Sequence, residues 1–143
     1  MGCHISEVKP ENRIEAYTAL KTKDFLRDCQ KQVKNFFCWT SFHGPHQPYT
    51  PPAKWAALYP VEKMPLPASW NEPIDHLPPG LQNWRRNTKT PWCLAKAAED
   101  PELYRRYIAY YFAQVTEVDH CIGEVLAELD ALVGVAIGIL VGR

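Results

Sequence analysis

The chain has 143 residues, of which 46% are hydrophobic and 22% charged, so it is long enough and apolar enough for one folded domain with its own core. Its 16 basic and 16 acidic side chains leave a formal net charge of zero, which gives no electrostatic footprint for nucleic acid or an anionic membrane. No stretch reaches the ~20 apolar residues that a bilayer-spanning helix needs. We therefore expect neither nucleic acid nor membrane as a partner.

The five cysteines are odd in number and irregular in spacing, and no CxxC pair occurs among them: Cys3, Cys29, Cys38, Cys93 and Cys121. Such a set indicates neither a zinc knuckle nor a disulfide framework, and it mildly favours a reducing compartment. The first residues lack the charged and then apolar pattern of a secretory signal. The cytoplasm is slightly favoured on these grounds, although we expect the true N-terminus to lie upstream of residue 1.

Residues 11–34 predict one helix or two short ones, because apolar residues recur at helical spacing behind Pro10: Ile14, Tyr17, Phe25, Cys29 and Val33. Residues 35–42, NFFCWTSF, form a short aromatic and β-branched run that is typical of a strand. The run lacks strict alternation of polar and apolar residues. We therefore expect a strand buried on both faces, as in a parallel sheet.

Residues 43–99 predict a long Pro-rich loop region on the substrate side of the domain. Eleven of the thirteen prolines lie between residues 44 and 91, and each one fixes φ and removes a backbone donor. A connection of this length inside a domain is typically functional or covers another part of the molecule. Its spaced apolar residues favour a segment that covers the body of the domain: Trp55, Leu58, Trp70, Leu77, Leu81 and Trp84.

Residues 100–132 predict a long amphipathic helix, which Asp100 can cap and in which Pro101 suits the first turn. Apolar residues step by three or four to make one stripe: Leu103, Tyr107, Tyr111, Val115, Val118, Ile122, Val125, Leu129 and Leu132. Polar residues are expected opposite: Arg105, Arg106, Gln114, Glu117, Glu124 and Glu128. The aromatic first half favours packing on a sheet over a coiled coil. Residues 133–143 form an apolar, strand-like tail, so the order of elements predicts an α/β fold.

The loop after the predicted strand contains His43 and His46, with Gly44 and Pro45 between them. Two histidines three residues apart do not make a metal site without further ligands. Spacing alone leaves three interpretations open: metal binding, a merely exposed pair, or a histidine directed at a substrate. Position favours the third, because ligands of parallel α/β sheets bind at the carboxyl ends of strands. The glycine and prolines also stiffen the loop, as a preorganised polar group requires.

Two separate stretches resemble the sulfatase family of the alkaline-phosphatase-like superfamily. The first, FLRDCQKQVKNFFCWTSFHGPHQPYTPPAKWAALYPVEKMPLP, is similar to the family's helix, its strand of the PFFLxxSF kind and its PHxPxxxPxxY motif. The second, YRRYIAYYFAQVTEVDHCIGEVLAEL, is similar to its long helix of the form YxAxVxxVDxxIGxVLxxL. The style is closest to choline-sulfatase-like enzymes and related bacterial arylsulfatases. The resemblance implies that residues 1–143 are part of an alkaline-phosphatase-like catalytic domain.

The resemblance implies hydrolysis of a small-molecule sulfate ester. Family members use a formylglycine, made within a CxPxR or SxPxR motif, as the nucleophile, and a divalent cation, usually calcium, polarises the sulfate. The histidine of the PHxP motif hydrogen-bonds the sulfate or the leaving-group oxygen, and that position is His46. His43 falls at a variable family position and is assigned to substrate binding as pocket lining. Asp119 matches a family aspartate for which we expect a structural role.

The sequence departs from the family at the catalytic centre. No CxPxR or SxPxR occurs, and the acidic pair that begins a sulfatase and its SDHG or SDNG loop, which supply metal ligands, are missing. We therefore expect an internal piece of a sulfatase that is inactive by itself and has no metal or cofactor site within the chain. Two alternatives stay open: a piece of a phosphonate monoester hydrolase or phosphodiesterase of the same superfamily, and a non-catalytic interaction module.

Overall fold

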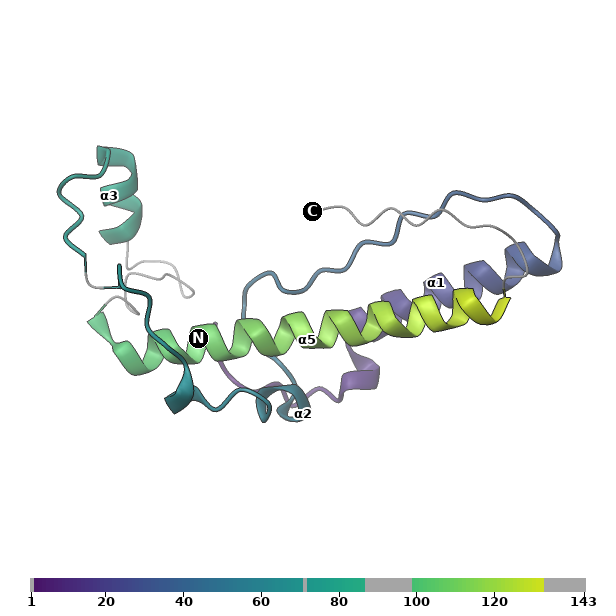
Figure 1. The fold of residues 1–143 in the computed structure, drawn as a ribbon, viewed down its shortest axis with the longest axis horizontal. Helices are drawn as coiled ribbons and strands as arrows, with labels where there is room; N and C mark the ends of the chain where they lie inside the picture. Colours follow the sequence, from purple (N-terminus) through teal and green to yellow (C-terminus); the bar gives the residue numbers. More distant parts are fainter. Residues whose placement is uncertain (1, 71, 87–98, 133–143) are drawn as a thin grey trace.

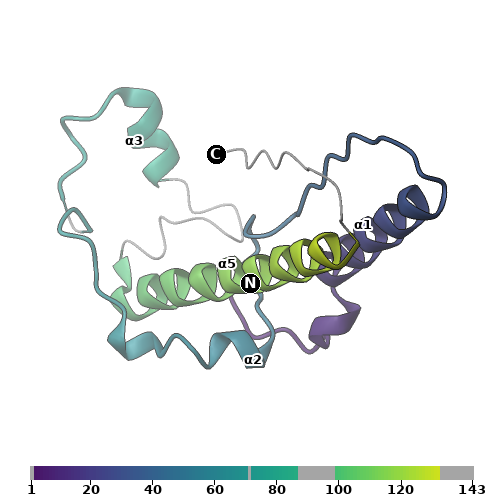
Figure 2. The ribbon, with the colours of Figure 1, turned by 45° about the vertical axis from the view of Figure 1, so that its right-hand side comes forward.

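A computed structural model describes residues 2–70, 72–86 and 99–132 of the chain. Two long helices, α1 (Ile14–Lys31) and α5 (Pro101–Leu132), make up its body and lie side by side (Figures 1 and 2). The shorter elements are η1 (Pro10–Asn12), α2 (Ala53–Ala56), η2 (Val61–Lys63) and α3 (Pro79–Arg86). None of the described helices is long and apolar enough to cross a membrane. The predicted strand-like tail, residues 133–143, lies outside the described residues.

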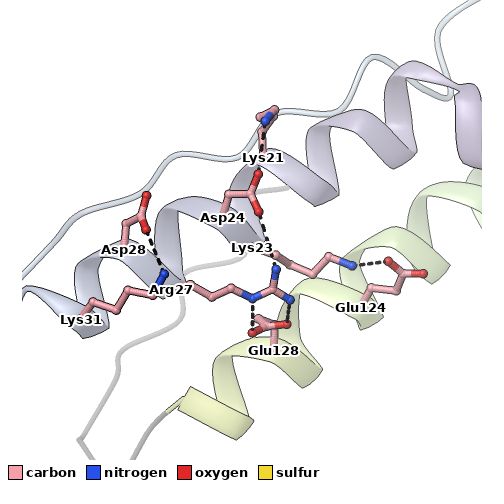
Figure 3. Close-up of polar contacts among 8 residues, drawn as sticks. All are labelled: Lys21, Lys23, Asp24, Arg27, Asp28, Lys31, Glu124 and Glu128. Carbon is pink, nitrogen blue, oxygen red and sulfur yellow. Dashed lines mark hydrogen bonds and ion pairs between the residues drawn. The ribbon is translucent and has the colours of Figure 1, made fainter.

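Helices α1 and α5 run in the same direction and are joined by ion pairs along one edge (Figure 3). Lys23 Nζ lies 2.7 Å from Glu124 Oε2. The Arg27 guanidinium donates two hydrogen bonds to Glu128, from Nε at 2.8 Å and from Nη2 at 2.6 Å. Both pairs join residues 101 positions apart in the sequence, so the two helices are parallel and in register. The buried apolar residues of the pair are mostly small, which lets the axes lie close together: Ala19, Leu26, Tyr107, Ala109, Ala113 and Cys121.

Both ends of α1 differ from the predicted range of 11–34. At its start, extended backbone at Arg13 (φ −85°, ψ 161°) separates η1 from α1, so the chain forms a 3-10 turn and one helix. At its end, Val33 N donates to Gln30 O at 3.0 Å and Lys34 N donates to Cys29 O at 3.1 Å. This pattern is a Schellman motif, with Val33 in the left-handed region at φ 50°. A β-branched residue is disfavoured there, so the end of α1 at Lys31 could not be predicted from the residue at position 33.

Helix α5 begins within one residue of its predicted start. Asp100 Oδ1 accepts hydrogen bonds from the backbone N–H groups of Glu102 and Leu103, both at 3.0 Å, and Pro101 is the first helical residue. The cap and the proline therefore act as the sequence predicted, because both signals are local.

The predicted faces of α5 are wrong in part. Gln114 and Glu117, which were assigned to the polar face, are only 4% and 3% exposed. By contrast Tyr111, Val115 and Ile122 of the predicted apolar stripe are 40%, 38% and 37% exposed. The side of the helix that is buried is the one that meets α1 and the loop after residue 42, and the sequence pattern of α5 alone does not identify those neighbours.

Residues 35–42 do not form the predicted buried strand. The segment is extended but pairs with no strand in the described ranges, and Phe37 and Trp39 are 82% and 80% exposed. Its other face lies on α1, where the rings of Phe25 and Phe36 meet edge to face with centroids 5.8 Å apart. A strand needs a neighbour for its backbone N–H and C=O groups, and the described part of the chain supplies none for this segment. The described ranges therefore contain helices of the predicted α/β fold and no paired strand at residues 35–42.

Residues 49–64 cover α5 as predicted for part of the Pro-rich region. The Trp55 ring lies 5.1 Å from that of His120, and the Tyr59 hydroxyl is 2.6 Å from Thr116 Oγ1. Because 55 pairs with 120 and 59 with 116, the segment runs antiparallel to α5. Other residues expected in this cover are instead exposed: Leu58, Leu81 and Trp84.

Candidate functional site

The histidine loop, residues 43–50, leaves the extended segment and passes across the helix pair toward α2 (Figures 1 and 2). Its far end is fixed to the N-terminal residues. Tyr49 N donates to Gly2 O at 2.8 Å, His4 N donates to Tyr49 O at 3.3 Å, and Cys3 and Tyr49 form an isolated parallel bridge. The loop is thus held between the helices and the first residues of the chain.

A tight turn presents both predicted histidines at the surface. His46 N donates to His43 O at 3.2 Å, and the centroids of the two rings are 5.3 Å apart. His46 Nδ1 lies 2.6 Å from the carbonyl oxygen of Gln47. Because a carbonyl can only accept, Nδ1 carries the proton in this contact. Nε2 is then the ring nitrogen left for a ligand, as an acceptor when the ring is neutral and a donor when it is protonated.

Gly44 lies where the loop comes closest to the two helices. Its backbone N–H donates to Glu15 Oε1 of α1 at 3.2 Å. A Cβ added at this position would lie 3.0 Å from Val118 Cγ2 and 3.2 Å from the same Glu15 oxygen. A larger residue at this position therefore requires the Val118 or Glu15 side chain to shift by a few tenths of an ångström.

A buried ion cluster of Arg13, Glu15 and Glu117 lies beneath the loop. Arg13 Nε is 2.7 Å from Glu117 Oε1 and 3.6 Å from Glu15 Oε2, and both carboxylate side chains are only 3% exposed. Arg13 Nη1 also donates to Thr50 O in the loop at 3.0 Å. The cluster joins α1, α5 and the histidine loop through one guanidinium.

One cation faces two carboxyl groups in this cluster, so full ionisation would leave a buried net negative charge. Burial raises the pKa of Glu117 to about 7, opposed by the Arg13 guanidinium and reinforced by the charge of Glu15. Neither oxygen of Glu117 makes a well-directed hydrogen bond in the described ranges. A protonated Glu117 would make the cluster electrically neutral.

Gln114 and Tyr49 complete the contact between the loop and α5. Gln114 Nε2 donates to Pro48 O at 3.2 Å from a side chain that is almost fully buried. The Tyr49 ring packs edge to face between Tyr107 and Tyr111, with centroids at 5.6 Å and 5.8 Å. These contacts fix the loop to the first half of α5, whose aromatic residues were expected to pack on a sheet.

The described residues do not fit the divalent cation that the family resemblance implies. No group of three or more His, Cys, Asp or Glu side chains converges in the described ranges. The buried carboxylates of Glu15 and Glu117 enclose the Arg13 guanidinium, whose charge repels a metal ion. Asp119 is exposed on α5 and away from this cluster's buried face.

The structure thus brings His43 and His46 together and adds four residues that sequence reasoning missed: Arg13, Glu15, Gln114 and Glu117. A signal for one of them was present. Glu15 precedes Ala19 by four residues and Leu26 by eleven, which places a carboxylate on the buried line of α1. A charged residue at such a position indicates a partner inside the protein.

Comparison with known proteins identifies the family. The sulfatase family model matches residues 8–133. The chain is 33% identical to iduronate 2-sulfatase of Mus musculus over 75% of its length, and 32% identical to a sulfatase of Formosa agariphila over 68%. It is 30% identical to the multifunctional alkaline phosphatase superfamily protein PehA of Trinickia caryophylli, again over 68%. The chain belongs to the sulfatase family, whose domain has an alkaline-phosphatase-like fold.

The chain spans about a fifth of the length of the curated relatives it matches. The matched region is 20% of the mouse protein, 18% of the Formosa protein and 20% of PehA. The match therefore assigns these residues to the family, and it covers too little of the relatives to assign their reaction to the chain.

Proposed function

We propose that this chain is part of a sulfuric ester hydrolase and contributes the histidine side of a site for a small organic sulfate monoester. The observation that carries this proposal is the coincidence of the family match with the geometry at His46. The loop carbonyl of Gln47 occupies Nδ1, so the exposed ring offers Nε2 to a ligand. We expect neither nucleic acid nor membrane as a partner.

His46 can stabilise negative charge that develops on an ester oxygen. When protonated, its Nε2–H donates to a sulfate oxygen or to the leaving-group oxygen, and the proton can move to the leaving group as the S–O bond breaks. The Nδ1–H bond to Gln47 O holds the ring plane while this happens. His43, with its ring centroid 5.3 Å away, binds substrate beside His46 without taking the proton.

The chain by itself is proposed to be inactive. It contains no CxPxR or SxPxR motif for a formylglycine nucleophile. A formylglycine and calcium would both come from parts of a longer protein, because the described residues do not fit a metal. Purified residues 1–143 with calcium should hydrolyse 4-nitrophenyl sulfate no faster than the His46→Ala variant, and faster turnover would contradict this proposal.

The full proposal is tested in the longer protein obtained by reading the DNA on both sides of this coding region. We expect a CxPxR or SxPxR motif upstream and an SDHG or SDNG loop downstream. In that protein His46→Ala should lower kcat for 4-nitrophenyl sulfate by about 10²- to 10⁴-fold, the range for loss of a general acid. An unchanged kcat, or flanking frames without either motif, would overturn the proposal.

A second candidate is a phosphonate monoester or phosphodiester hydrolase of the alkaline phosphatase superfamily, the superfamily that the name of PehA gives. The same histidine geometry serves a phosphoryl oxygen as well as a sulfuryl oxygen. The two candidates are separated by comparing kcat/KM for 4-nitrophenyl sulfate and for 4-nitrophenyl phenylphosphonate in the longer protein.

A further inference from the structure

Three side chains, two from α1 and α5 and one from the residue that precedes α1, reach backbone atoms of the histidine loop, and we call them the loop clamp: Arg13, Glu15 and Gln114. Glu15 Oε1 accepts from Gly44 N at 3.2 Å. Gln114 Nε2 donates to Pro48 O at 3.2 Å. Arg13 Nη1 donates to Thr50 O at 3.0 Å. The loop is thus held at three points, by α1, by α5 and by the residue that precedes α1.

The three points bracket His46. Gly44 lies two residues before it, and Pro48 and Thr50 lie two and four residues after it. Within the described residues the His46 ring interacts with Gln47 and His43, both in its own loop. The direction of the ring therefore depends on where the loop backbone is held.

The loop clamp is built from groups that are costly to bury. Glu15 is 2% and Gln114 4% exposed, and the Arg13 side chain is 12% exposed. Replacing a whole buried ion cluster by apolar residues of similar volume often leaves stability unchanged or improves it, whereas removing a single member is strongly destabilising. Two of the three contacts involve a charged side chain, and such hydrogen bonds are stronger than those between two neutral groups.

We propose that Arg13, Glu15 and Gln114 are positioning residues for His46, which hold the loop so that Nδ1 stays on Gln47 O and Nε2 stays directed outward. The importance of that direction for catalysis rests on the proposed function. The three contacts of the loop clamp depend only on the folded chain and not on the proposed function. They are tested without any turnover.

The experiment uses the full chain, labelled with ¹⁵N, at a pH where the His46 ring is neutral. Long-range ¹H–¹⁵N spectra report which ring nitrogen carries the proton, and His46→Asn assigns the signal. Amide exchange reports the protection of Gly44. Glu15→Met removes the acceptor of the Gly44 N–H at similar volume, and Gln114→Met removes the donor to Pro48 O without changing charge.

We expect wild-type His46 to be protonated on Nδ1. In Glu15→Met the Gly44 amide should exchange about five- to tenfold faster, the effect of roughly one lost hydrogen bond. In both variants the His46 signals should move toward a mixture of the two ring tautomers. Arg27→Met, which removes an α1–α5 ion pair away from the loop, should leave both readouts unchanged.

The proposal is overturned if folded Glu15→Met and Gln114→Met chains keep the wild-type tautomer of His46 and the wild-type protection of Gly44. Where Glu15→Met does not fold, Gln114→Met alone decides, because it loses a single neutral hydrogen bond. Addition of inorganic sulfate to the wild-type chain is a separate arm. A His46 signal that ignores sulfate counts against the proposed function and leaves the clamp readouts as they are.

Discussion

Charged residues join α1 to α5 at two places, and the two places differ in how much water reaches them. Near the histidine loop, Arg13 lies between Glu15 and Glu117, whose side chains are 3% exposed. Further along, Arg27 and Glu128 are 43% and 19% exposed. The first group also binds loop backbone, whereas the second joins only the two helices (Figure 3).

The difference shows that the same kind of ion pair serves two purposes. A buried charge loses its hydration, so it is favourable only where its partners are fixed, and removing one partner leaves the other uncompensated. An exposed pair is largely screened by water and salt and contributes little to stability. The buried cluster therefore defines the position of the loop, while the exposed pairs only align the helices.

The largest expected effect follows from removing the shared cation. Arg13→Met leaves two buried carboxyl groups without a positive partner and breaks the bond to Thr50 O, so we expect the free energy of unfolding to fall by about 3–5 kcal/mol. Urea denaturation followed by far-UV circular dichroism measures it. Arg27→Met is the matched control, and equal losses in the two variants would show that burial makes no difference.

A smaller effect concerns the pH dependence of stability. The pKa of Glu117 is about 7 in the folded chain and 4.5 when unperturbed, so the folded state binds more protons between these values. Its favourable contribution is complete below pH 4.5 and is lost as pH rises through 7, with a slope of up to about 1.4 kcal/mol per pH unit. The groups that face it are Arg13, Glu15 and the Cys121 thiol.

Glu117→Gln should remove this slope, because an amide stays neutral at every pH. We expect the variant to match the wild type near pH 4.5 and to be the more stable chain above pH 7. Urea midpoints of both chains, measured across this pH range, give the difference in stability at each pH. The contributions of the other titrating groups are the same in both chains and cancel. A constant difference between the two chains would refute the perturbed pKa.

The sequence predicted what local signals determine and missed what depends on distant neighbours. The start of α5 came from Asp100 and Pro101, which act within one turn. The burial of Glu117 depends on Arg13, which lies 104 residues earlier, so a face chosen by counting apolar residues along α5 could not find it. The motif predicted His43 and His46 as site residues, whereas the contacts that hold their loop were not predicted.

The predicted strand illustrates the same limit. Residues 35–42, with Phe37 and Trp39, are rich in the aromatic and β-branched residues that favour a strand. Whether such a run becomes a strand depends on a neighbouring backbone, which no property of residues 35–42 supplies. Because the segment pairs with no described strand, the rings of Phe37 and Trp39 remain exposed to water.

A substitution at the loop tests how closely it packs on the buried cluster. Gly44→Ala places a Cβ 3.0 Å from Val118 Cγ2, and a valine in a helix has little freedom to rotate away. We expect a loss of about 1–3 kcal/mol in the free energy of unfolding. Gly123→Ala is the control, since an added Cβ there meets nothing within 4 Å and alanine favours the helix. A Gly44→Ala chain as stable as the wild type would show that the loop can move off the helices.

The smallest effect is expected at the exposed end of the helix pair. Arg27→Met removes both hydrogen bonds to Glu128, but water can solvate the remaining carboxylate and the neighbouring Lys23 can pair with it. The unfolding midpoint should fall only slightly at low salt, and the difference from wild type should vanish near ~1 M salt, where the Debye length is about 3 Å. The loss caused by Arg13→Met should persist in the same salt, because ions do not reach a buried cluster. If salt abolished the stability differences of both Arg13→Met and Arg27→Met from the wild type, the two ion clusters would be screened alike, and the cluster beneath the loop would not behave as a buried one.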